Sequence, residues 1–231
     1  MDNKTFPFAT QNGKEGERRM NKITTLPAGS APCPATVNGN VLPPPRQKYA
    51  EVRSREHLTF DEVSRLVKAA GSVGRHRHRD RTLILLSYSH GLRVGEAVSL
   101  RWHQVDLKEG LLHVNRLKNG VPSTHPLRGA ELRVLRKLRR DYPDSPFVFV
   151  TERGGPLTTS TVRKLIARAG ERANLPFPIH PHMLRHALGY KLANDGHDTR
   201  AIQHYLGHKN IQHTVRYTEL ASDRFNNFWH D

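Results

Sequence analysis

The sequence predicts a mainly helical α+β domain that contains one small antiparallel β-hairpin. Apolar residues recur at helical spacing over most of residues 58–221, two segments alternate as strands do, and a hydrophobic content of 36% is enough for a core. Residues 1–54 are rich in proline and show neither pattern, so we expect a flexible N-terminal tail there. The domain is expected over residues 55–221, followed by a short aromatic tail over residues 222–231.

The first helix is expected from Thr59 to about Ala70, because Thr59 and Glu62 have the spacing of a capping box. Strands are expected over residues 111–115 and 123–127, joined through Lys118-Asn119-Gly120, where Asn-Gly supplies the positive φ of a tight turn. Apolar spacing and glycine stops predict the remaining helices over residues 80–90, 94–100, 129–140, 159–173, 182–194, 199–206 and 211–217.

The charge of the chain favours a polyanionic partner. It has 37 Lys and Arg against 21 Asp and Glu, a formal net charge of +16 and a pI near 10.5, and the basic residues are distributed along the whole chain. Such a surface is typical of proteins that follow a nucleic-acid backbone, although contact with an anionic membrane is an alternative. No apolar run approaches the roughly 18 residues of a membrane span, and no signal peptide is recognisable, so we expect a cytoplasmic protein.

Three short motifs contain residue types suited to phosphate chemistry. Arg93 and Glu96 lie in Gly-Leu-Arg-Val-Gly-Glu, where the arginine could clamp two phosphate oxygens or simply pair with the glutamate on the surface. His182 and Arg185 lie three residues apart at a helix start and share one face, so they can handle a proton and a negative charge together. His186 could complete a zinc pair with His182, but no cysteine or glutamate joins them at ligand spacing, and we expect no metal.

The third motif is Leu-Gly-His at residues 206–208, followed nine residues later by Tyr217. A lone tyrosine on an amphipathic helix usually packs against the core. Gly-Leu-Arg-x-x-Glu, the hairpin lysine, His-x-x-Arg-His, Leu-Gly-His and the late tyrosine together resemble the tyrosine recombinase family, also called phage integrases. The resemblance covers about residues 58–231 and implies the catalytic-domain fold of that family.

The resemblance also implies a role for each residue. Tyr217 would attack DNA and form a 3′-phosphotyrosyl ester that a 5′ hydroxyl later reverses, without metal, ATP or another cofactor. His182 would accept the phenol proton, because a phenol of pKa near 10 is mostly protonated at neutral pH. The other implied roles are phosphate contacts by Arg93, Arg185 and His208, general acid catalysis by Lys118, orientation of Arg93 by Glu96, and a supporting or core position for His186.

Most family members have a further helical DNA-binding domain before the catalytic domain, where this chain has the tail. The chain is therefore similar to short members such as the fimbrial phase-variation invertases, and we expect weak binding by single copies. The implied partners are double-stranded DNA, further copies that form a homotetramer on it, and accessory DNA-bending proteins. Residues 222–231 pack either on their own domain or, as the resemblance implies, on a neighbouring copy. Two alternatives remain: a non-enzymatic helix-turn-helix regulator built on residues 199–217, and a type IB-like topoisomerase.

Overall fold

The computed structural model describes residues 36–37, 40–41, 55–117 and 120–219. Contacts divide the chain into two compact units, Met1–Arg46 and Gln47–Asp231. In the first unit β1 (Thr36–Val37) pairs antiparallel with β2 (Asn40–Val41), a short hairpin in a segment for which the sequence predicted no regular structure. The rest of the expected tail and the whole of residues 222–231 lie outside the described residues.

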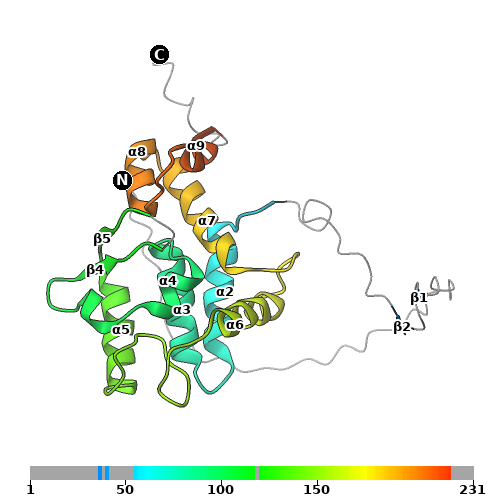
Figure 1. Ribbon diagram of the computed structural model, residues 1–231, viewed down its shortest axis with the longest axis vertical. Coiled ribbons are helices and arrows are strands. Elements are labelled where there is room, and N and C mark those ends of the chain that lie inside the picture. The colour runs from blue at the N-terminus through cyan, green and yellow to red at the C-terminus, as the bar shows by residue number, and fades with distance from the viewer. Residues whose placement is uncertain (1–35, 38–39, 42–54, 118–119, 220–231) are drawn as a thin grey trace, which may run out of the picture. The chain divides into compact units, whose positions relative to one another are not determined.

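The second unit is mainly helical with a small antiparallel sheet, which confirms the predicted fold class (Figure 1). The helix α3 lies among the other helices, α7 to α9 gather at one end, and the sheet lies beside α5. The helices are α2 (Phe60–Ser72), α3 (Arg77–Ser89), α4 (Val94–Ser99), α5 (Gly129–Asp141), α6 (Thr159–Arg172), α7 (Pro181–Asn194), α8 (Thr199–Leu206) and α9 (Gln212–Glu219), with a 3-10 turn η1 (Trp102–Gln104).

The helix ends follow the local chemistry of the sequence. The capping box at the start of α2 is present as predicted: the Thr59 hydroxyl accepts from the Glu62 N–H, and the Glu62 carboxylate accepts from the Thr59 N–H. The helix α3 begins at Arg77, three residues before the predicted start. Arg79 is buried there and donates to the Val150 carbonyl at 2.6 Å and to Asp80. The first turn of α3 is therefore packed against the rest of the domain.

The sheet has the order β3 (Val105–Asp106), β4 (Leu111–Val114), β5 (Ser123–Pro126). The strands β4 and β5 are the predicted hairpin, each one residue shorter than expected, with Leu112 opposite His125. The sequence did not predict β3, because two residues are too few for an alternating pattern to be visible. The predicted turn at Lys118-Asn119 lies outside the described residues.

One continuous hydrophobic core joins these elements, and its largest fully buried aliphatic side chains come from α2, α3, α5, α6 and β4. They include Leu66, Leu83, Leu86, Leu112, Leu135 and Ile166. Among the described residues, no helix is both long and apolar enough to cross a membrane.

Candidate active site

Tyr217 lies on α9 and is 98% buried, because its ring packs directly on the backbone of α7. A side chain at Gly189 would place its Cβ 2.7–2.8 Å from three ring carbons, so only glycine leaves room for the ring. The Tyr217 hydroxyl lies 2.9 Å from Nδ1 of His186, which is one turn before Gly189. The ring of Tyr190 meets the ring of Tyr217 edge-on, with 5.1 Å between the ring centroids. The helix α7 thus provides a fitted seat for the phenol.

The partner of the hydroxyl differs from the sequence prediction. His182 was expected as proton acceptor, whereas the hydrogen bond is made by His186, and His182 is exposed one turn earlier with its ring 4.4 Å from that of His186. The sequence places both histidines on one face of α7, but it does not show which of the two faces α9. Burial and then the charge of His182 lower the pKa of His186 to about 3, so its ring is neutral at neutral pH and is a weak base in the free protein.

Burial raises the pKa of Tyr217, against the opposing effect of the nearby Arg185 charge. The phenol is therefore protonated at neutral pH, and it needs both a base and nearby positive charge to become a nucleophile.

Arg185 is fully buried between α3 and α8. Its guanidinium donates to the Gly91 carbonyl at 2.5 Å and to the Leu206 carbonyl at 2.6 Å, and its Nε is buried without a hydrogen-bond partner. Burial, followed by the charges of Arg93 and Arg116, lowers the pKa of Arg185 to about 9. The sequence predicted a direct phosphate contact, whereas the two terminal nitrogens here bind protein carbonyls.

Glu96 connects the two arginines that flank this site. Its carboxylate accepts from the Arg93 side chain at 2.8 Å, from the Arg93 N–H at 2.9 Å, and from Arg116 at 3.0 Å. It also accepts from the Leu117 N–H at 3.1 Å, directly before Lys118. Burial alone would raise the pKa of Glu96, but these hydrogen bonds and the Arg116 charge lower it. Glu96 therefore stays ionised and orients Arg93, while a quarter of the Arg93 side chain remains exposed.

Arg116 is a residue that the sequence reasoning missed. Its buried guanidinium donates to the carbonyls of His90, Gly91 and Tyr205 as well as to Glu96. No local pattern marks it, because a single arginine after a strand is usually on the surface. Lys118 lies outside the described residues, and its predicted role has no geometry to support it.

His208 completes the group. Its Nδ1 lies 2.8 Å from the Thr214 hydroxyl, and its ring is stacked with that of Tyr217 at a centroid distance of 6.3 Å. Burial, then the charge of Arg185, lowers the pKa of His208 to about 3. The preceding Gly207 has φ of +66°, and a Cβ there would meet Arg116 at 2.6 Å and the Val121 carbonyl at 2.7 Å. The Leu-Gly-His motif therefore requires its glycine for both conformation and space.

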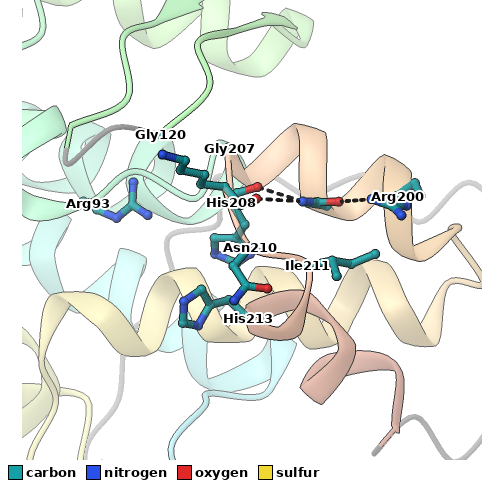
Figure 2. Close-up of a pocket in the computed structure, with 10 residues that line it drawn as sticks. Arg93, Gly120, Arg200, Gly207, His208, Asn210, Ile211 and His213 are labelled. Atoms are coloured by element: carbon teal, nitrogen blue, oxygen red, sulfur yellow. Dashed lines mark hydrogen bonds between the residues drawn. The ribbon is translucent and has the colours of Figure 1, made fainter.

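An open cavity of about 650 Å³ lies beside these residues, between the hairpin and the α8–α9 connection (Figure 2). It is lined by Arg93, Gly120, Arg200, Gln203, Gly207, His208, Lys209, Asn210, Ile211 and His213. Within the described part of the chain, no group of three or more His, Cys, Asp or Glu side chains could hold a metal ion.

Comparison with known proteins gives consistent matches over the same region. The sequence profile of the phage integrase family matches residues 56–224. The type 1 fimbriae regulatory proteins FimB and FimE of Escherichia coli K12 are 43% and 41% identical to this chain over 185 and 183 residues. FimB matches over 78% of this chain and 92% of its own length, and FimE over 76% and 91%. Tyrosine recombinase XerD of Ralstonia nicotianae is 38% identical over 153 residues, which are 63% of this chain and 50% of that protein.

Two solved structures share the fold. The crystal structure of XerA recombinase gives a TM-score of 0.65 at 28% identity, over 74% of this chain and 63% of that one. A lambda integrase dimer bound to a COC′ core site gives a TM-score of 0.58 at 25% identity, over 76% of this chain and 50% of that one.

Proposed function

The chain belongs to the phage integrase family of site-specific tyrosine recombinases, and from this premise we propose that Tyr217 is the residue that attacks the DNA backbone. The observation that carries the proposal is the convergence of His186 and Arg185 from α7, Tyr217 from α9, and His208 from the α8–α9 connection. A packing tyrosine would need none of these partners.

In the proposed step, the Tyr217 oxygen forms a bond to the scissile phosphorus, and the bond from phosphorus to the 5′ oxygen breaks. The phenol proton passes to His186, which is in hydrogen-bond contact with the hydroxyl. Because the pKa of His186 is low in the free protein, this step requires the bound anionic phosphate to raise the basicity of the ring. The departing 5′ oxygen takes a proton, for which Lys118 is the candidate from its place in the sequence. The resulting 3′-phosphotyrosyl ester is opened by a 5′ hydroxyl in the reverse reaction, so no metal or ATP is required.

The positive groups would stabilise the charge that develops on the phosphate oxygens. Arg93 reaches the cavity and is fixed by Glu96, which makes it the candidate for the first contact. Arg185 is fully buried, and its unpartnered Nε is a donor that protein groups leave unused. His208, adjacent to the ring of Tyr217, would supply a further hydrogen bond.

Double-stranded DNA is the partner of such an enzyme. We propose further that the protein works in the cytoplasm as a homotetramer on DNA, that residues 55–221 form the catalytic domain after a tail of residues 1–54, and that accessory proteins bend the site. Residues 222–231 are proposed to pack on a neighbouring copy. Deleting these ten residues should reduce assembly on paired sites more than binding to one site, and an equal loss in both would contradict the proposed role.

A covalent-capture experiment tests the nucleophile. A pool of nicked suicide duplexes with randomised sequence would be incubated with the wild-type chain and with Tyr217→Phe, and adducts that resist denaturation would be collected and sequenced. We expect adducts at a defined sequence with the wild type and none with the variant. Adducts in both would disprove the assignment to Tyr217, and adducts in neither would favour a non-enzymatic DNA reader. Relaxation of plasmids of any sequence would indicate a topoisomerase.

A further inference from the structure

Arg200 shares a cavity with the candidate active site but has no part in the proposed reaction. It lies in the first turn of α8, and Figure 2 shows it across the cavity from Arg93, with His208 between them. Lys209 lines the same cavity, and both cationic side chains belong to exposed residues. The cavity therefore has positive charge on two sides, of which the proposed chemistry uses one.

The guanidinium of Arg200 is oriented by the loop that holds His208. It donates to Oε1 of Gln203 at 3.2 Å, and Nε2 of Gln203 donates to the carbonyls of His208 at 3.0 Å and Lys209 at 3.5 Å (Figure 2). Gln203 is buried although it lines the cavity, so the surrounding protein restricts the position of its amide. A long side chain that would otherwise sample many rotamers is thus directed by the same backbone that positions a reaction-centre histidine.

No acidic side chain neutralises these cations within the described residues, where neither Arg200 nor Lys209 takes part in an ion pair. The nearby Asp198 carboxylate caps α8 instead, accepting from the backbone N–H groups of Arg200 and Ala201. Two uncompensated cations beside an open cavity are suited to an anionic ligand.

The size of the cavity indicates more than one phosphate. Its volume of about 650 Å³ equals that of roughly 20 water molecules at about 30 Å³ each, which far exceeds one phosphate group. Consecutive phosphates of a strand are spaced by about 3.4 Å along the duplex axis. A strand that places one phosphate at Arg93 therefore carries its neighbours along the same cavity.

We propose that Arg200, with Lys209, binds a non-scissile phosphate of the same DNA strand and so sets the register of the scissile phosphate at Arg93. The inference rests on the proposed function, and it makes Arg200 a positioning residue. The planar guanidinium offers paired donors to two oxygens of that phosphate, and the Lys209 ammonium adds a point charge.

A scan with neutral methylphosphonates tests the contact. A duplex selected only for binding would carry one methylphosphonate at a time, and Tyr217→Phe protein would be used so that no cleavage occurs. We expect about a tenfold loss of affinity at one non-scissile position, the range for a charge-assisted hydrogen bond. The double variant Tyr217→Phe, Arg200→Gln should bind the unmodified duplex about tenfold more weakly and show no further loss at that position.

Salt dependence and two control variants complete the test. Arg200→Gln should reduce the slope of log K against log salt by about 0.9, the value for one phosphate contact, and Arg200→Lys should restore it. Arg140→Gln, which removes the same charge from the exposed face of α5, should keep the full methylphosphonate profile. If Arg200→Gln keeps the complete profile, or Arg200→Lys restores nothing, Arg200 acts only through Gln203 and the proposal is wrong. Absence of covalent adducts with the wild type would instead refute the proposed function and leave this binding result standing.

Discussion

Replacing Gly189 with alanine should displace the nucleophile without unfolding the protein. The added Cβ would lie 2.7–2.8 Å from three carbons of the Tyr217 ring, whereas carbon atoms rest at about 3.5–4.0 Å, so the ring must move by about 1 Å. A displacement of about 1 Å at a reacting group can lower the rate by roughly 100-fold.

The effect on stability should be much smaller. Alanine inside a helix gains about 1 kcal/mol over glycine, and overpacking costs about 1–3 kcal/mol. The net change of about 0–2 kcal/mol corresponds to a fall in melting temperature of at most about 8 °C for a domain of this size. A small fall in melting temperature together with a large fall in reaction rate would show that the substitution acts by displacing the Tyr217 ring.

The assay is the single-turnover rate of adduct formation on the captured suicide duplex, with the melting temperature measured by calorimetry. The matched control is Gly129→Ala at the start of α5, where an added Cβ meets no atom within 4 Å, and this variant should react at the wild-type rate. If Gly189→Ala reacts as fast as wild type or faster, Tyr217 does not attack from its position against α7, and the prediction is wrong.

Two further predictions concern buried charge. Glu96→Gln should lower the free energy of unfolding in urea by about 3–5 kcal/mol, because it leaves the buried Arg116 cation without its anion. The control is Glu152→Gln, which removes an exposed ion pair and should change the free energy of unfolding by less than about 1 kcal/mol. Equal losses in the two variants would contradict the prediction. Acidification should destabilise the fold, since the pKa values of His90 and His125 are lowered to about 3 by burial while an unfolded histidine titrates near 6.5. As the pH falls, the unfolded chain binds protons before the folded chain does, so the stability is full above pH 6.5 and declines below it. At pH 5.5 the free energy of unfolding should be lower than at pH 7.5 by about 1.4 kcal/mol per buried histidine. The measurement is urea unfolding followed by circular dichroism. Unchanged stability between these two pH values would show that the histidines are accessible in the folded state.

The sequence predicted every α-helix of the domain to within about three residues. Most of these helices have an apolar stripe or a capping residue, whereas α3 and α7 are buried along most of their length. Thr59 before α2 and Gly207 after α8 fixed two of these boundaries. What it missed were features that depend on a partner outside the segment itself. The strand β3, two residues long, is defined only by its pairing with β4, and the early start of α3 accompanies a hydrogen bond from Arg79 to the distant Val150 carbonyl.

The candidate site shows the same division. Linear motifs named Tyr217, His208 and Arg93, but the histidine in hydrogen-bond contact with the phenol is His186, and helical periodicity could not decide between two histidines on one face. Arg116 had no signal at all, because its contacts are with the carbonyls of His90 and Gly91, directly after α3, and of Tyr205 in α8. Residues of the family motifs can be found from the sequence pattern. Residues whose side chains bind the protein's own backbone can be identified only from the folded structure.

The carbonyls around Arg185 and Arg116 have a consequence for catalysis. The carbonyls of Tyr205 and Leu206 belong to the last turn of α8, where C=O groups concentrate partial negative charge, and that of Gly91 lies two residues past the end of α3. In the free protein, these carbonyl oxygens supply the partial negative charge that an anion would otherwise supply. They lie beside Arg185 and Arg116, whose positive charges would otherwise repel one another. Under the proposed mechanism, a phosphate must compete with this internal counterion. An exchange of this kind gives little net affinity for resting DNA and gives more to the more highly charged transition state, so the site discriminates by charge density.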